Sequence, residues 1–146
     1  MLNNTEILQN VQLVMQLFER SANSLAQKYG LLPMEMSVLM LLINNPGRDT
    51  ASDIVELRML PKANVSKAVE GLIQKKLLVR RPDAADRRRV HLLLTPAGAA
   101  MTAEVEALRD VFATDLFWGF TPRQREEYAA LNARIIENAQ KALERK

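Results

Sequence analysis

Cysteine is absent from this chain of 146 residues, and histidine occurs once, as His91. Without thiols the chain can form no disulfide, no thiol redox sensor and no cysteine-ligated zinc or iron–sulfur site. A single histidine argues against a histidine-rich metal site, so we expect neither a metal nor another cofactor. No nucleophile–base pair can be recognised in the sequence. The sequence therefore does not predict an enzyme, and we assign no catalytic residue.

Long hydrophobic runs are also absent. The longest uninterrupted run, Val38 to Ile43, is far too short to cross a bilayer. The N-terminus has neither the basic region nor the apolar stretch of a signal peptide, so we expect a cytoplasmic protein without a membrane partner. The hydrophobic fraction of 48% is sufficient for the core of one compact domain with long helical extensions.

The net charge is small overall but unevenly distributed. The segment from Arg58 to His91 holds ten lysines and arginines against three acids, so it carries +7 in a chain whose total is +3. The remaining residues therefore carry −4. A basic module within an otherwise acidic protein is typical of polyanion binding, but a solvated basic surface would have the same composition. Charge alone favours the two interpretations about equally.

Apolar residues at spacings of three and four predict a long first helix. It begins near Thr5, as the N-cap, and ends at Gly30. A second helix over 35–45 is apolar on most faces, which predicts a position in the middle of the domain. The apolar stripe of the first helix consists of Ile7, Val11, Val14, Phe18, Ala22, Leu25 and Tyr29.

Caps and prolines divide the rest of the helical sequence. Thr50 with Asp53, and Thr121 with Gln124, have the spacing of capping boxes that open helices. Pro61 suits the first turn of the helix that follows the short third one. These signals predict helices over 50–59, 61–76, 95–116 and from 121 to the C-terminus.

Between the fourth and fifth predicted helices lies a hairpin. Residues 77–82 predict a short strand, and residues 90–94 predict its partner, because this second stretch is apolar and partly β-branched. The connecting tip is polar and rich in arginine. The order of elements predicts a mainly α fold with a small β-wing, namely a winged helix-turn-helix flanked by long N- and C-terminal helices.

This order divides the chain into three parts. We expect an N-terminal dimerisation helix with its connector over 1–33, a winged helix-turn-helix DNA-binding domain over 34–96, and C-terminal dimerisation helices over 97–146. The terminal helices carry apolar stripes longer than the middle domain can cover, and an identical chain is the commonest partner for such a stripe. The residues predicted at this homodimer interface are Ile7, Val11, Leu108, Phe112, Leu131 and Ile135.

The middle part has the chemistry needed to bind double-stranded DNA. In a helix-turn-helix, the second helix presents its N-terminal residues to base edges in the major groove. In the wing, Arg87 and Arg88 are predicted to enter the minor groove, with Asp86 holding one guanidinium. The residues predicted in the major groove are Lys62, Ala63, Asn64, Ser66 and Lys67, and those predicted on the DNA backbone are Thr50, Ser52 and Arg80.

Each of these residues also has an ordinary structural explanation. Lys62 and Lys67 can be solvated lysines, and Asn64 can simply cap the helix. Arg89 can lie along the sheet and pair with a wing aspartate, and His91 fits a surface or half-buried position better than a ligand site. The main alternative function is a winged helix that binds protein, which the basicity argues against, because interface cores are depleted in charge. The joint occurrence of these features in this order favours DNA.

Two segments have a pattern of residues that points to a known family. The first holds residues 77–81, Asp86-Arg87-Arg88, Leu94-Thr95 and Gly98, and the second covers the helix-turn-helix at 51–55 and 65–77. Together they resemble the MarR family of bacterial winged-helix transcription regulators, over nearly the whole chain. The resemblance implies a homodimer with interlocked terminal helices and a roughly palindromic operator. It also implies regulation, often repression, by a small organic effector bound between the dimer region and the DNA-binding lobe.

The resemblance also assigns roles to residues. Asp86 and Arg88 match the wing's aspartate and minor-groove arginine. Pro61 stands where a Ser or Thr cap is usual, so the recognition helix is expected to begin differently. The cysteine and histidine contents argue against thiol and zinc sensing, which leaves an organic effector, a protein signal or no effector. The effector-binding residues cannot be read from the sequence. The exposed face of the family's recognition helix is matched by Lys62, Asn64, Ser66 and Lys67.

Overall fold

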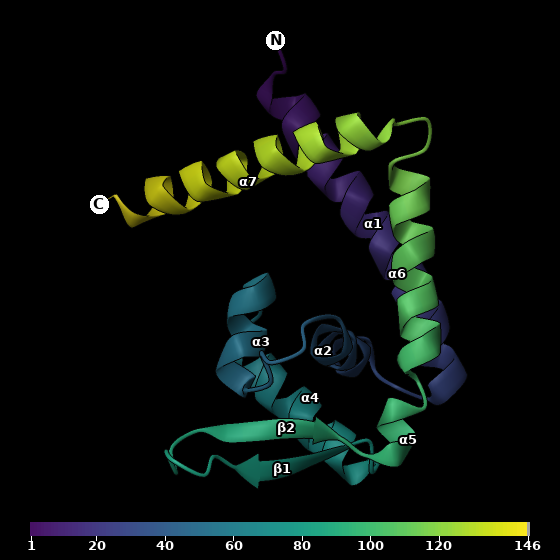
Figure 1. Cartoon of the computed structure of the whole chain (residues 1–146), viewed down its shortest axis with the longest axis vertical. Helices are drawn as coiled ribbons and strands as arrows, with labels where there is room; N and C mark the ends of the chain where they lie inside the picture. Colours follow the sequence, from purple (N-terminus) through teal and green to yellow (C-terminus); the bar gives the residue numbers. More distant parts are fainter. Residues whose placement is uncertain (146) are drawn as a thin grey trace. The chain divides into compact units, whose positions relative to one another are not determined.

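A computed structural model describes residues 1–145 as a helical protein with one small sheet, which confirms the predicted fold class. Figure 1 shows the elements along the chain. The helices are α1 (Asn4–Tyr29), α2 (Pro33–Asn44), α3 (Ala51–Arg58), α4 (Lys62–Gln74), α5 (Pro96–Ala99), α6 (Thr102–Leu116) and α7 (Pro122–Glu144). The two strands, β1 (Leu78–Pro82) and β2 (Val90–Leu94), pair antiparallel.

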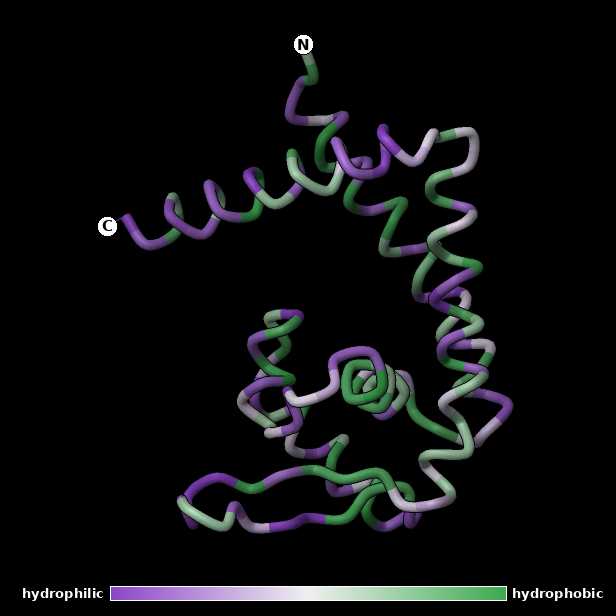
Figure 2. The backbone as a smooth tube through the Cα atoms, viewed as in Figure 1, coloured by the Kyte–Doolittle hydropathy of each residue, from purple (hydrophilic) through white to green (hydrophobic). Residues whose placement is uncertain are grey.

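The chain forms two compact units, Met1–Phe112 and the residues from Ala113 onward. The core of the first unit surrounds α2, which packs against α1, α3 and α4. Met36, Val38 and Leu39 on α2 are completely buried, and Figure 2 colours most turns of this helix as hydrophobic. The prediction that the second helix lies in the middle of the domain is therefore confirmed. No helix within residues 1–145 is long and apolar enough to span a membrane.

The first helix begins earlier than the sequence predicted. Its N-cap is Asn3, whose side chain accepts from the backbone N–H of Glu6 at 2.9 Å, while the Glu6 carboxylate accepts from the N–H of Asn3 at 3.0 Å. The prediction of Thr5 as the cap was wrong, because only Asn3 has a glutamate three residues later to complete the capping box. The predicted end is confirmed, since Gly30 adopts a left-handed conformation with φ of 64°.

The other two capping boxes are confirmed. The hydroxyl oxygen of Thr50 accepts from the N–H of Asp53 at 3.1 Å, and that of Thr121 accepts from the N–H of Gln124 at 3.1 Å. In return, the side chains of Asp53 and Gln124 accept from the backbone N–H groups of Thr50 and Thr121, respectively. The caps therefore fix where α3 and α7 start.

The predicted fifth helix is two helices, which corrects the single span 95–116. α5 ends at Ala99, a turn follows, and α6 begins at Thr102. Thr95 donates from its backbone N–H to the Leu77 carbonyl at 3.0 Å and from its hydroxyl to the Lys76 carbonyl at 2.7 Å. A Cβ on Gly98 would overlap the Leu77 carbonyl oxygen. These contacts fasten α5 to the root of the wing, so the chain must turn before it continues as α6.

Candidate nucleic-acid interface

Helix α4 presents one apolar face to the core and one polar face to solvent. Its buried residues are Val65, Ala68, Val69 and Leu72, which pack this helix against α2 and α3. The opposite face holds every residue predicted in the major groove, all of them exposed: Lys62, Ala63, Asn64, Ser66 and Lys67. The structure thus brings these side chains together on one accessible helix face, and their contacts with bases remain a prediction.

The start of α4 differs from that of the other long helices. Pro61 occupies the N-cap position with φ of −61° and supplies no side-chain cap, and the first turn contains no acid. Unpaired N–H groups and the helix dipole therefore leave the start of α4 electropositive. This is the altered helix entry that Pro61 led us to expect, and it suits an anionic partner.

The wing tip is built around two aspartates. The Oδ2 atom of Asp83 accepts from the backbone N–H groups of Ala85 and Asp86, each at 2.9 Å. Asp86 Oδ1 in turn accepts from the Arg88 backbone N–H at 3.0 Å and lies 3.4 Å from Arg88 Nε. The Arg88 side chain is 93% exposed. The tip is therefore an ordered turn that projects an arginine into solvent, with the aspartate beside it as predicted.

Arg89 does not pair with either wing aspartate within the described residues, because both carboxylates have other partners. Asp86 contacts Arg88, and Asp83 contacts His91. Arg89 itself is exposed, and its carbonyl accepts from the backbone N–H of Asp83 at 2.9 Å. Three consecutive arginines, Arg87 to Arg89, are thus exposed at the wing tip.

His91 bridges the wing to the loop before α3. Its Nδ1 lies 2.6 Å from Asp49 Oδ1 and its Nε2 lies 2.7 Å from Asp83 Oδ1. Hydrogen bonds to Asp83 and then to Asp49 raise the pKa of His91 above its ordinary value of 6.5. The bond from His91, followed by the N–H groups of Asp86 and Ala85, holds the pKa of Asp83 well below its ordinary value. His91 is half-buried, as predicted, but its two partners were not foreseen.

The residues predicted on the DNA backbone lie in different surroundings. Ser52 is exposed at the start of α3, whereas Thr50 is almost buried and its hydroxyl oxygen caps that helix. Arg80 on β1 forms an ion pair with Glu70 on α4. A hollow of about 530 Å³ separates the start of α3 from the wing, and it is lined by Thr50, Ala51, Ser52, Asp53, Arg88, Arg89 and Val90. Backbone contacts by Thr50, Ser52 and Arg80 remain predictions.

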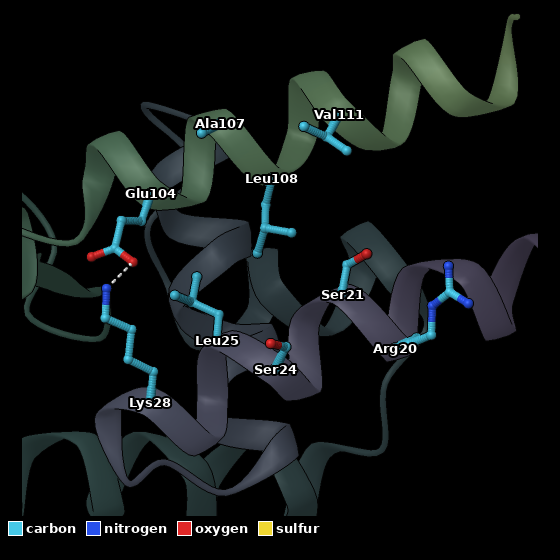
Figure 3. Close-up of a pocket in the computed structure, with 9 residues that line it drawn as sticks. All are labelled: Arg20, Ser21, Ser24, Leu25, Lys28, Glu104, Ala107, Leu108 and Val111. Atoms are coloured by element: carbon cyan, nitrogen blue, oxygen red, sulfur yellow. Dashed lines mark hydrogen bonds and ion pairs between the residues drawn. The ribbon is translucent and has the colours of Figure 1, made fainter.

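A second hollow lies within the first unit, between α1 and α6. Figure 3 shows Leu25, Leu108 and Val111 on its walls, Arg20 at one end, and the Lys28–Glu104 ion pair at the other. The Lys28 Nζ to Glu104 Oε2 distance is 2.8 Å. The volume of this hollow is about 650 Å³. Sequence reasoning gave no residue of this hollow a ligand-binding role, because its two walls come from helices some eighty residues apart in the chain.

The residues predicted at a dimer interface fall into two groups. Ile7, Val11, Leu131 and Ile135 are exposed in the single chain. Leu108 is partly buried against the core, and Phe112 packs edge-to-face on Phe18 with ring centroids 5.9 Å apart. Among the described residues of α7, none is buried. The apolar side chains of Leu131 and Ile135 on α7 are thus exposed, whereas Tyr128 on the same helix packs edge-to-face on Phe117 with ring centroids 5.3 Å apart.

A sequence model of the MarR family matches residues 29–89. This segment is similar to a MarR-family domain. The matched segment runs from the end of α1 through the helix-turn-helix to the wing tip, so it includes the predicted major-groove and wing residues. The resemblance inferred from the sequence is confirmed.

A curated relative also matches the chain, at modest sequence identity. The chain is 30% identical over 89 residues to a proposed transcriptional regulatory protein for the hcr operon of Thauera aromatica. The alignment covers 61% of this chain and 53% of the relative, so the chain spans about half the length of the protein it matches.

Solved structures of MarR-family proteins share the fold. A candidate MarR-family regulator from Listeria monocytogenes, in complex with a 26mer DNA, superposes with a TM-score of 0.80 at 14% identity, covering 90% of this chain and 87% of that one. BpsR from Bordetella bronchiseptica, whose DNA binding is regulated by 6-hydroxynicotinic acid, gives 0.67 at 24% identity, with 91% and 92% covered. Because these superpositions cover about nine tenths of this chain, the shared fold includes terminal helices as well as the winged helix-turn-helix.

Proposed function

We propose that this protein is a sequence-specific DNA-binding transcription regulator that acts as a homodimer on a roughly palindromic operator. The observation that carries the proposal is that donor groups are exposed in two places, on one face of α4 and at the wing tip. A recognition helix in the major groove and a wing arginine in the adjacent minor groove would use both. The DNA-bound Listeria relative supports this interpretation. Such a regulator acts where the chromosome is, in the cytoplasm.

Selection of bound DNA from a random duplex pool, at near-physiological salt, tests the proposal. Enrichment of an inverted repeat with half-sites about one helical turn apart is expected from a dimer with one recognition helix per subunit. Affinity for the enriched site should fall steeply as salt rises, because several lysines and arginines would release counterions. If a folded dimer enriches no sequence, DNA recognition is rejected and a protein partner becomes the favoured reading of the winged helix.

Asn64→Ala is expected to relax base preference at one position in each half-site. The amide of asparagine can pair with two groups of adenine, which is worth about 1–3 kcal/mol of discrimination against other bases. Comparison of selected sequence logos for the variant and the wild type measures the effect. Asn23→Ala, an exposed asparagine on α1, is the matched control and should leave the logo unchanged. An unaltered logo for Asn64→Ala would show that Asn64 does not read a base.

The homodimer is supported by exposed apolar residues on α1 and α7, among them Ile7, Val11, Leu131 and Ile135. Ile135→Asp is expected to give monomers, because Ile135 is 65% exposed in the single chain and a charge buried in an interface is costly. Light scattering measures the mass, and circular dichroism checks that the helices persist. Gln140→Asp, which adds the same charge on the same helix, is the control. A dimer that survives Ile135→Asp would remove Ile135 from the interface.

Regulation, most simply repression relieved by a small organic ligand, completes the proposal. The hollow between α1 and α6 combines apolar walls with the guanidinium of Arg20 (Figure 3), a combination suited to an organic anion with an apolar ring. BpsR, which has the same fold, is regulated by an aromatic acid of this kind. Screening small organic acids for release of operator DNA tests this part separately from DNA recognition.

A further inference from the structure

The bridge formed by Asp49, His91 and Asp83 connects the helix-turn-helix to the wing. Asp49 belongs to the loop before α3, Asp83 begins the wing tip, and His91 lies on β2 between them. The same loop is also joined to the wing through the backbone, because the N–H of Leu92 donates to the Asp49 carbonyl at 2.8 Å. Strand β2 of the wing is thus fixed to the loop by one backbone hydrogen bond and one imidazole.

The bridge continues to the wing arginine. One oxygen of Asp83 contacts His91, and its other oxygen accepts from the N–H groups of Ala85 and Asp86. The Asp86 carboxylate then accepts from Arg88. A continuous series of hydrogen bonds therefore leads from Asp49 to Arg88, the residue expected to enter the minor groove.

The two carboxylates require a charged imidazole. A neutral imidazole donates through only one nitrogen, so its other nitrogen would face a carboxylate lone pair to lone pair. The protonated ring donates to both carboxylates at once. Each nitrogen faces a different aspartate, so the three groups form a linear bridge and do not converge on a common point where a metal could bind.

We propose that His91 is a positioning residue that, in its protonated form, holds the wing in the orientation from which Arg88 contacts DNA. This inference rests on the proposed DNA-binding function. It concerns the placement of the wing, to which Asp49, His91 and Asp83 contribute without touching DNA themselves.

The sign of the pH dependence follows from the raised pKa of His91. The bridge is complete while His91 is protonated, and it weakens as the pH rises through the raised pKa of the folded protein. The carboxylate of Asp83 has a lowered pKa and stays ionised throughout this range. The elements next to His91 carry further charged groups. Arg81 lies opposite His91 on β1, and Arg89 belongs to the wing. Arg48 in the loop pairs with Asp53 on α3.

The test combines NMR with DNA binding. His91 is the only histidine, so its imidazole resonances can be titrated without ambiguity. Operator affinity is measured in parallel between about pH 6 and pH 9 at constant ionic strength. We expect the wild-type affinity to fall about threefold to tenfold as His91 deprotonates, a fraction of the loss from removing an arginine contact outright.

Three variants separate positioning from general damage. His91→Gln should bind DNA more weakly at pH 6 and lose the pH step. Asp83→Asn keeps an oxygen for the two backbone N–H groups but removes the charge, so it should move the His91 pKa and the midpoint of the affinity profile to lower pH together. Arg81→Gln removes one positive charge from the wing and should keep the step. A wild-type step retained in His91→Gln overturns the proposal.

A double-mutant cycle tests whether His91 acts through Arg88. If it does, His91→Gln should have little further effect in an Arg88→Ala background, whereas additive losses would contradict the proposal. If the wild type binds no duplex at all, it is the proposed function that fails. Hydrogen exchange of the wing amides then tests whether His91 holds the wing. Faster exchange in His91→Gln than in the wild type supports this role, and equal rates overturn it.

Discussion

Arg88→Ala is expected to weaken operator binding by about 1–3 kcal/mol, which is about fivefold to 150-fold in affinity. The Arg88 side chain is 93% exposed, and among residues 1–145 the acid that it contacts is Asp86, so its removal should leave the fold of the wing intact. The negative potential of a narrow minor groove is where a guanidinium gains most. Fluorescence anisotropy with the selected operator measures the change.

A charge-matched control separates this contact from general electrostatics. Arg123→Ala removes the same charge from α7, where the side chain is 88% exposed, and is expected to change affinity little. Both variants should remain dimeric by light scattering. Unchanged affinity for Arg88→Ala, with the dimer intact, would remove Arg88 from the interface.

Gly71→Ala is expected to lower the free energy of unfolding by about 1–3 kcal/mol. In an ordinary helix this substitution stabilises by up to about 1 kcal/mol. Here α4 crosses α2 so closely that a Cβ on Gly71 would overlap Oε2 of Glu35. Glu35 is only 2% exposed, and its other oxygen accepts from the N–H of Leu32 and from Lys75 Nζ, so it cannot easily move aside. Urea denaturation measures the change.

The double variant Glu35→Ala/Gly71→Ala identifies the cause. Glu35→Ala alone should be destabilising, because it removes a helix cap and leaves the ammonium of Lys75 with the Gly30 carbonyl but without a carboxylate. With the glutamate gone, the added methyl group has room, so the cost of Gly71→Ala should largely disappear. Equal costs of Gly71→Ala in both backgrounds would show that the close contact with Glu35 is not responsible.

Features that depend on neighbouring residues were predicted well from the sequence. The capping boxes at Thr50 and Thr121, the left-handed end at Gly30 and the two strands of the wing all follow from signals within a few residues. The exposed face of α4 followed from its helical period. The start of α1 was missed because two good cap residues lie close together, and the complete box at Asn3 decides between them.

Features that depend on distant contacts could not be predicted. The break between α5 and α6 accompanies the packing of Gly98 and Thr95 on the backbone of Lys76 and Leu77, just before β1. Asp49 lies 42 residues before His91, and Glu35 lies 40 residues before Lys75. A sequence shows that such groups exist, but only the folded chain shows which of them meet.

The fastening of α5 to the root of the wing makes the hairpin very uneven in its tolerance of change. Between Asp83 and Arg88 the backbone is supported mainly by its own aspartates, so residues there can be exchanged or inserted with little effect on the rest of the fold. At Leu77, Thr95 and Gly98 the backbones are in direct contact, and a methyl group added at Gly98 would overlap the Leu77 carbonyl oxygen. New DNA preferences can thus evolve at the tip, while the root stays constant and keeps the wing aligned with the recognition helix.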